Sequence, residues 1–264
     1  MLSEILTFIF FVLIGLEIRE GLQKPKDAIL PAISALGGML LPVLIFLLLV
    51  PGSRAWAVSM PTDVALAIGA LSILGKRVNP AVRLFLLTLA VADDFFSLVV
   101  IGIFFRDDLH LASAIYTLGA AAIGFILPFR HRLIAILSPI ATFIIIPVYV
   151  FINLLTQLDF SVASEKISVA IVAARVIGKV VGITLFTYLA IRFTKLTLPS
   201  ALHLKEIVGV GFLAGMGLTV SIVIAEITLQ TESELAQVRM GLFFAAIVSG
   251  ICGVLWLKRF PVSP

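Results

Sequence analysis

Runs of about twenty consecutive apolar residues, separated by short polar segments, fill almost the whole chain. About 20 helical residues cross the hydrocarbon core of a bilayer, whereas barrel strands would alternate apolar and polar residues. The sequence therefore predicts an all-α polytopic membrane protein, with residues 1–264 as a single membrane domain and about nine transmembrane helices. The expected spans are 2–20, 28–50, 55–75, 81–105, 111–129, 133–157, 167–192, 206–227 and 238–257.

Composition supports this prediction and excludes other classes. The chain is 61% hydrophobic and only 13% charged, which is too apolar to cover the surface of a soluble globule and too apolar for disorder. The net charge of +4 is attributed to loops, so no nucleic acid partner is expected. Cys252 is the single cysteine, which excludes an intramolecular disulfide.

Basic residues indicate the orientation of the spans. Of the 19 Lys and Arg residues, 13 fall in the tail and in the loops after the first, third, fifth and seventh spans. Four fall on the other side, and two lie within a span. Because basic residues collect on the cytoplasmic side, we expect a protein of the inner cell membrane with its N-terminus outside and its C-terminus in the cytoplasm.

Several ionisable residues lie well inside the expected spans, among them Asp63, Asp93, Asp94, Arg175 and Lys179. Placing one such side chain in the bilayer core costs about 3 kcal/mol on insertion scales, so each is expected to have a compensating partner or a function. An internal salt bridge that joins helices is one reason. A single cation cannot easily pair with both Asp93 and Asp94, because neighbouring residues point about 100° apart on a helix. One aspartate of the pair is expected to pair with Lys179, which leaves the other to bind an exchangeable cation, either a metal ion or a proton.

Two spans also contain helix-breaking residues. Pro61 precedes Asp63 in the third span, and Gly215 and Gly217 lie near the middle of the eighth. Close helix packing alone explains many membrane glycines. One interrupted span in each half, however, is typical of inverted-repeat transporters, whose broken helices flank an ion near the midplane.

Polar residues beside these breaks are suited to satisfy the freed backbone groups. Thr62, Thr219 and Ser221 are candidates for this role. Asp63 is expected to offset the positive ends of the half-helices, and Lys179 the negative ends.

These stretches resemble the NhaA-type sodium/proton antiporter family. The matching segments are 11–17, 62–65, 86–94, 177–179 and 214–225, in family order along the chain. The resemblance implies an inverted-repeat core with two crossing discontinuous helices. Residues 28–105 would form the first repeat, 106–166 a reduced central linker, and 167–257 the second repeat.

The resemblance also implies roles for individual residues. Asp94 is similar to the carboxylate that binds sodium or lithium, and Asp93 to its neighbour, which pairs with the lysine matched by Lys179. Thr62, Asp63 and Thr219 would lie at the crossing, opposite Gly215 and Gly217, and Glu17 in a cytoplasmic funnel. The family exchanges internal sodium for external protons electrogenically, by alternating access and without a cofactor.

Several features depart from the family. The resemblance implies that the chain begins at the family's second helix and has one helix where the family has three, between the aspartate pair and Pro139. The lost parts include a dimer contact, so a homodimer is left open. Most of the family's pH-sensing cluster is absent. Arg175 is an additional in-span cation, for which Glu226 is the suggested partner.

Three functions remain in view at this stage. Sodium/proton exchange is the leading hypothesis. The missing helices allow a reduced homologue that folds in the membrane without transporting, and the architecture allows a sodium-coupled symporter. An enzyme is not expected, because the spans contain no nucleophile–base pair, phosphate loop or metal cluster.

Overall fold

A computed structural model describes residues 2–21, 25–75, 78–105, 119–128, 130–199 and 202–260, and within these ranges it contains helices and no strand. Six of the described helical segments are long and apolar enough to cross a membrane, and a further pair of helices meets the same test with a 51° bend at its break. The segments are Ala28–Leu49, Arg54–Ser72, Pro80–Phe104, Arg132–Gln157, Lys166–Phe193 and Glu232–Lys258, with the bent pair Leu204–Ala214 and Thr219–Thr228. The chain is therefore a polytopic, helical membrane protein.

Two of the nine expected spans are not among these. The first, 2–20, forms α1 (Leu2–Gly21), which is 20 residues long but includes Glu17 and Arg19 among its charged residues. Residues 111–118 and 129 of the fifth expected span, 111–129, lie outside the described residues, and the described part contains α6 (Ala120–Ile126). The number nine stays a prediction.

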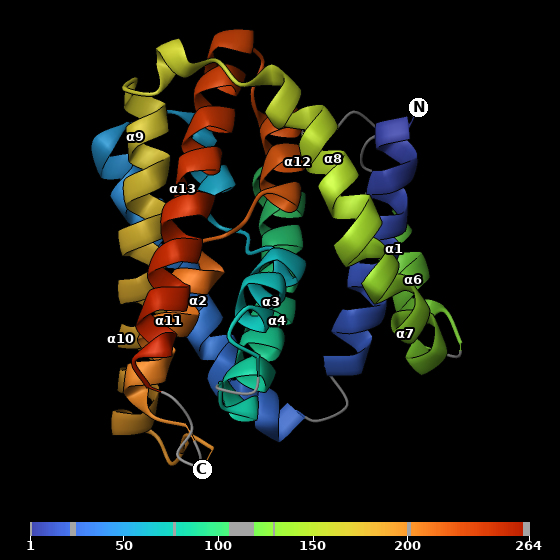
Figure 1. Ribbon diagram of the computed structural model, residues 1–264, viewed down its shortest axis with the longest axis vertical. Coiled ribbons are helices and arrows are strands. Elements are labelled where there is room, and N and C mark those ends of the chain that lie inside the picture. The colour runs from blue at the N-terminus through green and yellow to red at the C-terminus, as the bar shows by residue number, and fades with distance from the viewer. Residues whose placement is uncertain are drawn as a thin grey trace.

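One side of the bundle is built from α1, α6, α7 (Arg130–Ile140) and α8 (Ile146–Asn153), joined by a π-helical turn at Ala141–Ile145 (Figure 1). α1 and α6 approach closely, because a Cβ on Gly15 would meet the carbonyl of Ala121 and one on Gly124 would meet that of Val12. One turn further, Arg19 Nη1 donates to the carbonyls that end α6, including Leu127 O at 3.1 Å. The glycine contacts mark the point where α1 and α6 cross, and the Arg19 contacts place the C-terminal ends of the two helices side by side.

The other side contains α2 (Pro25–Leu49), α4 (Pro80–Phe104), α9 (Lys166–Ala173), α10 (Lys179–Phe193) and α13 (Glu232–Lys258) (Figure 1). α2 packs on α4, and α9 packs on α13. α2 also packs along α10, with the backbone of Gly37 against that of Gly182 and a 2.6 Å hydrogen bond between Ser34 and Thr187. A π-helical turn at Ala174–Gly178 joins α9 to α10 and was not predicted from the sequence.

Two helical segments are interrupted in the middle of the bundle (Figure 1). The expected span 55–75 is the 3₁₀ helix η1 (Arg54–Ser59) followed by α3 (Val64–Ser72), and 206–227 is α11 (Leu204–Ala214) followed by α12 (Thr219–Thr228). The connections pass close to each other, since Thr62 Oγ1 donates to Ala214 O at 3.1 Å. The helices therefore break where the sequence places proline and glycine, and the polar residues gather there.

Candidate functional site

Asp63 lies where the N-termini of α3 and α12 come together. Its carboxylate caps α3 by accepting from the Leu66 amide at 3.4 Å, and it accepts from both the amide, at 3.3 Å, and the hydroxyl of Thr219 at the start of α12. Exposed amide groups give a helix N-terminus a partial positive charge. One buried carboxylate therefore offsets two positive helix ends.

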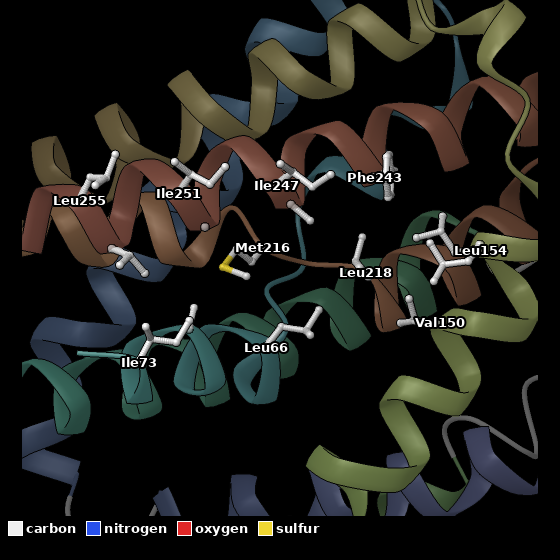
Figure 2. Close-up of a pocket in the computed structure, with 15 residues that line it drawn as sticks. Leu66, Ile73, Val150, Leu154, Met216, Leu218, Phe243, Ile247, Ile251 and Leu255 are labelled. Carbon is white, nitrogen blue, oxygen red and sulfur yellow. The ribbon is translucent and has the colours of Figure 1, made fainter. Parts of the chain in front are cut away.

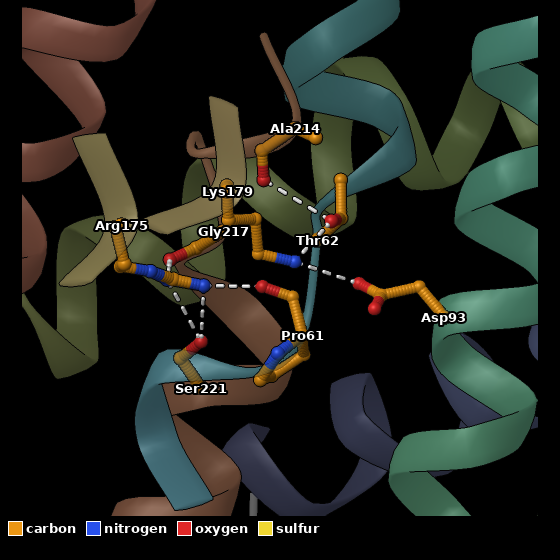
Figure 3. Close-up of polar contacts among 8 residues, drawn as sticks. All are labelled: Pro61, Thr62, Asp93, Arg175, Lys179, Ala214, Gly217 and Ser221. Atoms are coloured by element: carbon orange, nitrogen blue, oxygen red, sulfur yellow. Dashed lines mark hydrogen bonds and ion pairs between the residues drawn. The ribbon is translucent and has the colours of Figure 1, made fainter. Parts of the chain in front are cut away.

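Lys179 provides a positive charge where the two breaks meet, whereas Asp63 provides a negative one. Its ammonium donates to Asp93 Oδ2 at 3.0 Å and to Thr62 Oγ1 at 2.8 Å (Figure 3). The Thr62 hydroxyl in turn donates a hydrogen bond to the carbonyl of Ala214, the last residue of α11. The structure thus brings Lys179, Asp93 and Thr62 together, and the cation reaches a negative helix end through the threonine hydroxyl.

Asp94 is buried but differs from Asp93 in its partners. Oδ1 of each aspartate lacks a hydrogen-bond partner among the described residues, but Asp93 has an ion pair with Lys179 through its Oδ2. Asp94 is only 3% exposed, and its carboxylate has no ion pair with any described residue. Asp93, Glu17, Asp63 and Lys179 are all near enough to interact with it electrostatically. Buried polar atoms in native proteins are nearly always hydrogen-bonded, so an unpartnered carboxylate oxygen indicates a proton, ion or water as its partner. Chemically, this carboxylate can hold a proton or a small cation.

Glu17 is a further acidic residue near Asp63 and Asp94, and it comes from the other side of the bundle. It lies on α1, is partly buried, and interacts electrostatically with both Asp63 and Asp94. No group of three His, Cys, Asp or Glu side chains in the described part of the chain is arranged to hold a metal ion. Any cation at Asp94 would therefore need carbonyl, hydroxyl or water oxygens as further ligands.

The glycines in the second break provide space. A Cβ on Gly217 would collide with the Arg175 guanidinium and with Pro61 O, and one on Gly215 would collide with the Ser249 hydroxyl. Neither glycine has a positive φ that only glycine tolerates. Gly217 is therefore needed because the two breaks approach closely, and Gly215 because the second break lies against Ser249 of α13.

Arg175 is fully buried, and its suggested pairing with Glu226 is wrong. Its guanidinium donates to Gly217 O at 2.6 Å, to Ser221 Oγ at 3.0 Å, and to Pro61 O (Figure 3). Glu226 is exposed and interacts instead with Arg239. The sequence could not show this arrangement, because a backbone carbonyl that becomes an acceptor carries no signature in the residue types.

A cavity of about 530 Å³ lies beside this site and has a different character (Figure 2). It lies between α3, α8 and α13 and reaches Met216 and Leu218 at the second break. The side chains that line it are all apolar, so it offers no ligand to an ion. The candidate ion site is the polar cluster at the crossing.

Comparisons with known proteins agree with this arrangement. The family model described as Na+/H+ antiporter 1 matches residues 1–132 and 127–257. The protein named Na(+)/H(+) antiporter NhaA 2 of Aliarcobacter butzleri (strain RM4018) is 30% identical over 331 residues, covering 100% of this chain and 84% of the relative. Those named Na(+)/H(+) antiporter NhaA of Actinobacillus pleuropneumoniae serotype 7 (strain AP76) and Salmonella paratyphi B (strain ATCC BAA-1250 / SPB7) are also 30% identical, covering 95% and 97% of the chain and 80% and 82% of the relatives.

These alignments also locate a shortening inside the chain. The Aliarcobacter match spans 331 residues against the 264 of this chain, a difference of 67. The two family-model matches meet at residues 127–132, between α6 and α7. That difference is enough for two or three membrane helices. Since both segments match in order and together span nearly the whole sequence, the chain belongs to the NhaA-type Na+/H+ antiporter family.

Proposed function

We propose that this protein exchanges sodium for protons across the membrane, with the Asp94 carboxylate as the site for which the two cations compete. The observation that carries the proposal is the buried Asp94 carboxylate, which has no ion pair with any described residue, next to an Asp93 carboxylate that is already paired with Lys179. The names of the relatives support sodium and protons as the substrates, and lithium is a candidate substitute for sodium.

The charges around Asp94 explain why exchange requires the cations to alternate. With Asp93 paired to Lys179, an ionised Asp94 is an uncompensated buried charge, which is unstable in a medium of low dielectric constant. Binding either sodium or a proton removes that cost, and binding one excludes the other. Alternating access then follows if the site opens to one side at a time, with Glu17 attracting cations on the cytoplasmic side.

The proposal includes nine crossings, with the N-terminus outside and the C-terminus inside. α4 ends beside the start of η1, since Phe105 stacks with Trp56 at 5.5 Å between ring centroids, and this is the end of the bundle where α2 finishes. α6 ends beside Arg19, at the end where α2 begins. Phe105 and Leu127 therefore lie at opposite ends of the bundle, which supports a crossing within the fifth expected span.

Two inverted repeats, 28–105 and 167–257, complete the proposed architecture, with 106–166 as the reduced linker. Each contains three helical segments of which the second is broken, and in each the first packs on the third. α2 and α9 begin at opposite ends of the bundle (Figure 1), as repeats of inverted orientation require.

Proteoliposomes with an imposed sodium gradient and a pH-sensitive dye test the function. The wild-type protein should move protons when sodium is added, and Asp94→Asn should abolish this flux because the amide cannot exchange a proton. Asp159→Asn, which removes an exposed loop carboxylate, should leave the flux unchanged. Absence of sodium-driven flux in the wild type, or equal flux in Asp94→Asn, would refute the proposal.

The missing 67 residues favour one alternative, a homologue that folds in the membrane without transporting. Growth of cells that lack their own sodium antiporters separates the two. Rescue on high sodium or lithium by the wild type, and no rescue by Asp94→Asn, would exclude the non-transporting alternative. Well-expressed wild-type protein that gives no rescue would support it.

A further inference from the structure

Arg175 is a second buried cation, one turn before Lys179, that the proposed exchange does not use. Its guanidinium makes four hydrogen bonds, to Gly217 O, to Pro61 O, and from both terminal nitrogens to Ser221 Oγ (Figure 3). Burying a cation in a membrane-spanning segment is costly unless it is compensated. The buried charge of Arg175 must therefore be offset by its surroundings.

The acceptors around the guanidinium are all uncharged oxygens. Two are backbone carbonyls and one is a hydroxyl. Within the described ranges no carboxylate lies at salt-bridge distance from Arg175, and Asp93 and Asp63 act on it only from further away. Carbonyl and hydroxyl oxygens are what proteins use to replace the hydration shell of a monovalent cation. The guanidinium therefore lies in surroundings of the kind that bind a free ion.

Each carbonyl belongs to a different break. Pro61 O comes just before α3, and Gly217 O just before α12. A Cβ on Gly217 would collide with both the guanidinium and Pro61 O, so the position exists only because residue 217 is glycine. Arg175 itself lies in the π-helical turn Ala174–Gly178, and such turns often occur at functional sites.

We propose that Arg175 is a tethered cation: its guanidinium fills an oxygen-lined cation position shared by the two breaks, and this position binds a free guanidinium ion when the side chain is truncated. In the intact protein the tethered cation holds the two breaks together. It also keeps transported cations out of the crossing, which leaves Asp94 as their site; this last consequence rests on the proposed function.

Thermal unfolding of the purified protein tests the position without requiring transport. Arg175→Ala should unfold at a lower temperature than the wild type, and guanidinium chloride at low millimolar concentration should raise that temperature by about 3 °C at ten times its dissociation constant. Tetramethylammonium chloride, which cannot donate hydrogen bonds, should not. Arg192→Ala, which removes an exposed arginine at the end of α10, is the matched control and should gain nothing from guanidinium. Equal responses of the two variants would overturn the proposal.

A second variant tests the position directly. Adding Gly217→Ala to Arg175→Ala places a methyl group among the same oxygens, so the guanidinium response should disappear; a response that persists would overturn the proposal. If Arg175→Ala cannot be purified, Arg175→Gln, which shortens the side chain and removes the charge, is titrated in the same way with the same two outcomes. Failure of the wild type to exchange ions would refute the proposed function and leave this test intact.

Discussion

At the scale of single residues, the site depends on which buried charges are paired and which are not. Lys179 and Asp93 are both essentially inaccessible and lie 3.0 Å apart, while Asp94 interacts with several charges but bonds to none of the described residues through its Oδ1. Two adjacent aspartates thus have different environments because they face different directions from one helix. Under the proposed function, the paired Asp93 is structural and Asp94 is the exchangeable carboxylate.

Lys179→Ala should destabilise the protein strongly. Removing the ammonium leaves Asp93 buried without a counter-charge and Thr62 without its donor, and breaking a buried pair in this way costs about 3–5 kcal/mol. Thermal unfolding in detergent measures the loss, with Lys195→Ala, an exposed residue after α10, as the control. A Lys179→Ala variant as stable as this control would contradict the role given to the pair.

At the scale of helices, glycines decide which backbones approach one another. Gly37 on α2 and Gly182 on α10 pack backbone to backbone, and Gly15 on α1 packs against α6 in the same manner. In membrane helices small residues permit this close approach, because lipid provides no hydrophobic force to press helices together. Lys179, the first residue of α10, pairs with Asp93 of α4, which itself packs on α2.

Gly182→Ala should therefore destabilise the protein, whereas Gly102→Ala should not. A Cβ at Gly182 would meet the carbonyl of Gly37, which only a shift of the helix can relieve, so the unfolding temperature should fall. A Cβ at Gly102 on α4 meets nothing within 4 Å, so alanine there should be neutral or stabilise the helix by up to about 1 kcal/mol. Similar melting temperatures for the two variants would show that the close contact has no energetic role.

At the scale of the whole molecule, the chain belongs to a family whose members are longer, and the difference falls between α6 and α7. Both breaks and the charged cluster lie in the helices on either side of that point, so the shortening leaves the place where the two breaks meet intact. Loss of two crossings would preserve the direction of every later helix, and the proposed orientation, argued from the basic residues, requires this.

Thiol labelling in intact cells should reveal this orientation. After Cys252 is replaced by serine, a cysteine at Ser161, exposed in the segment between α8 and α9, should react with a membrane-impermeant reagent. A cysteine at Thr197, exposed between α10 and α11, should react only after the cells are opened. The reverse pattern would invert the proposed topology, and labelling of both in intact cells would contradict the number of crossings between them.

The sequence by itself determined the membrane class, most spans, the two breaks and the in-span charges. Those features depend on local properties. A long apolar run must be buried in lipid, proline and glycine interrupt a helix, and a charged side chain inside a span is too costly to be there without a partner or a function. Only the tertiary structure decided that Arg175 bonds to the carbonyls of Pro61 and Gly217 rather than to Glu226, and that a π-helical turn precedes Lys179. Backbone carbonyls freed at a break are identical in every residue type, so which side chain they bind depends on how segments distant in the sequence come together.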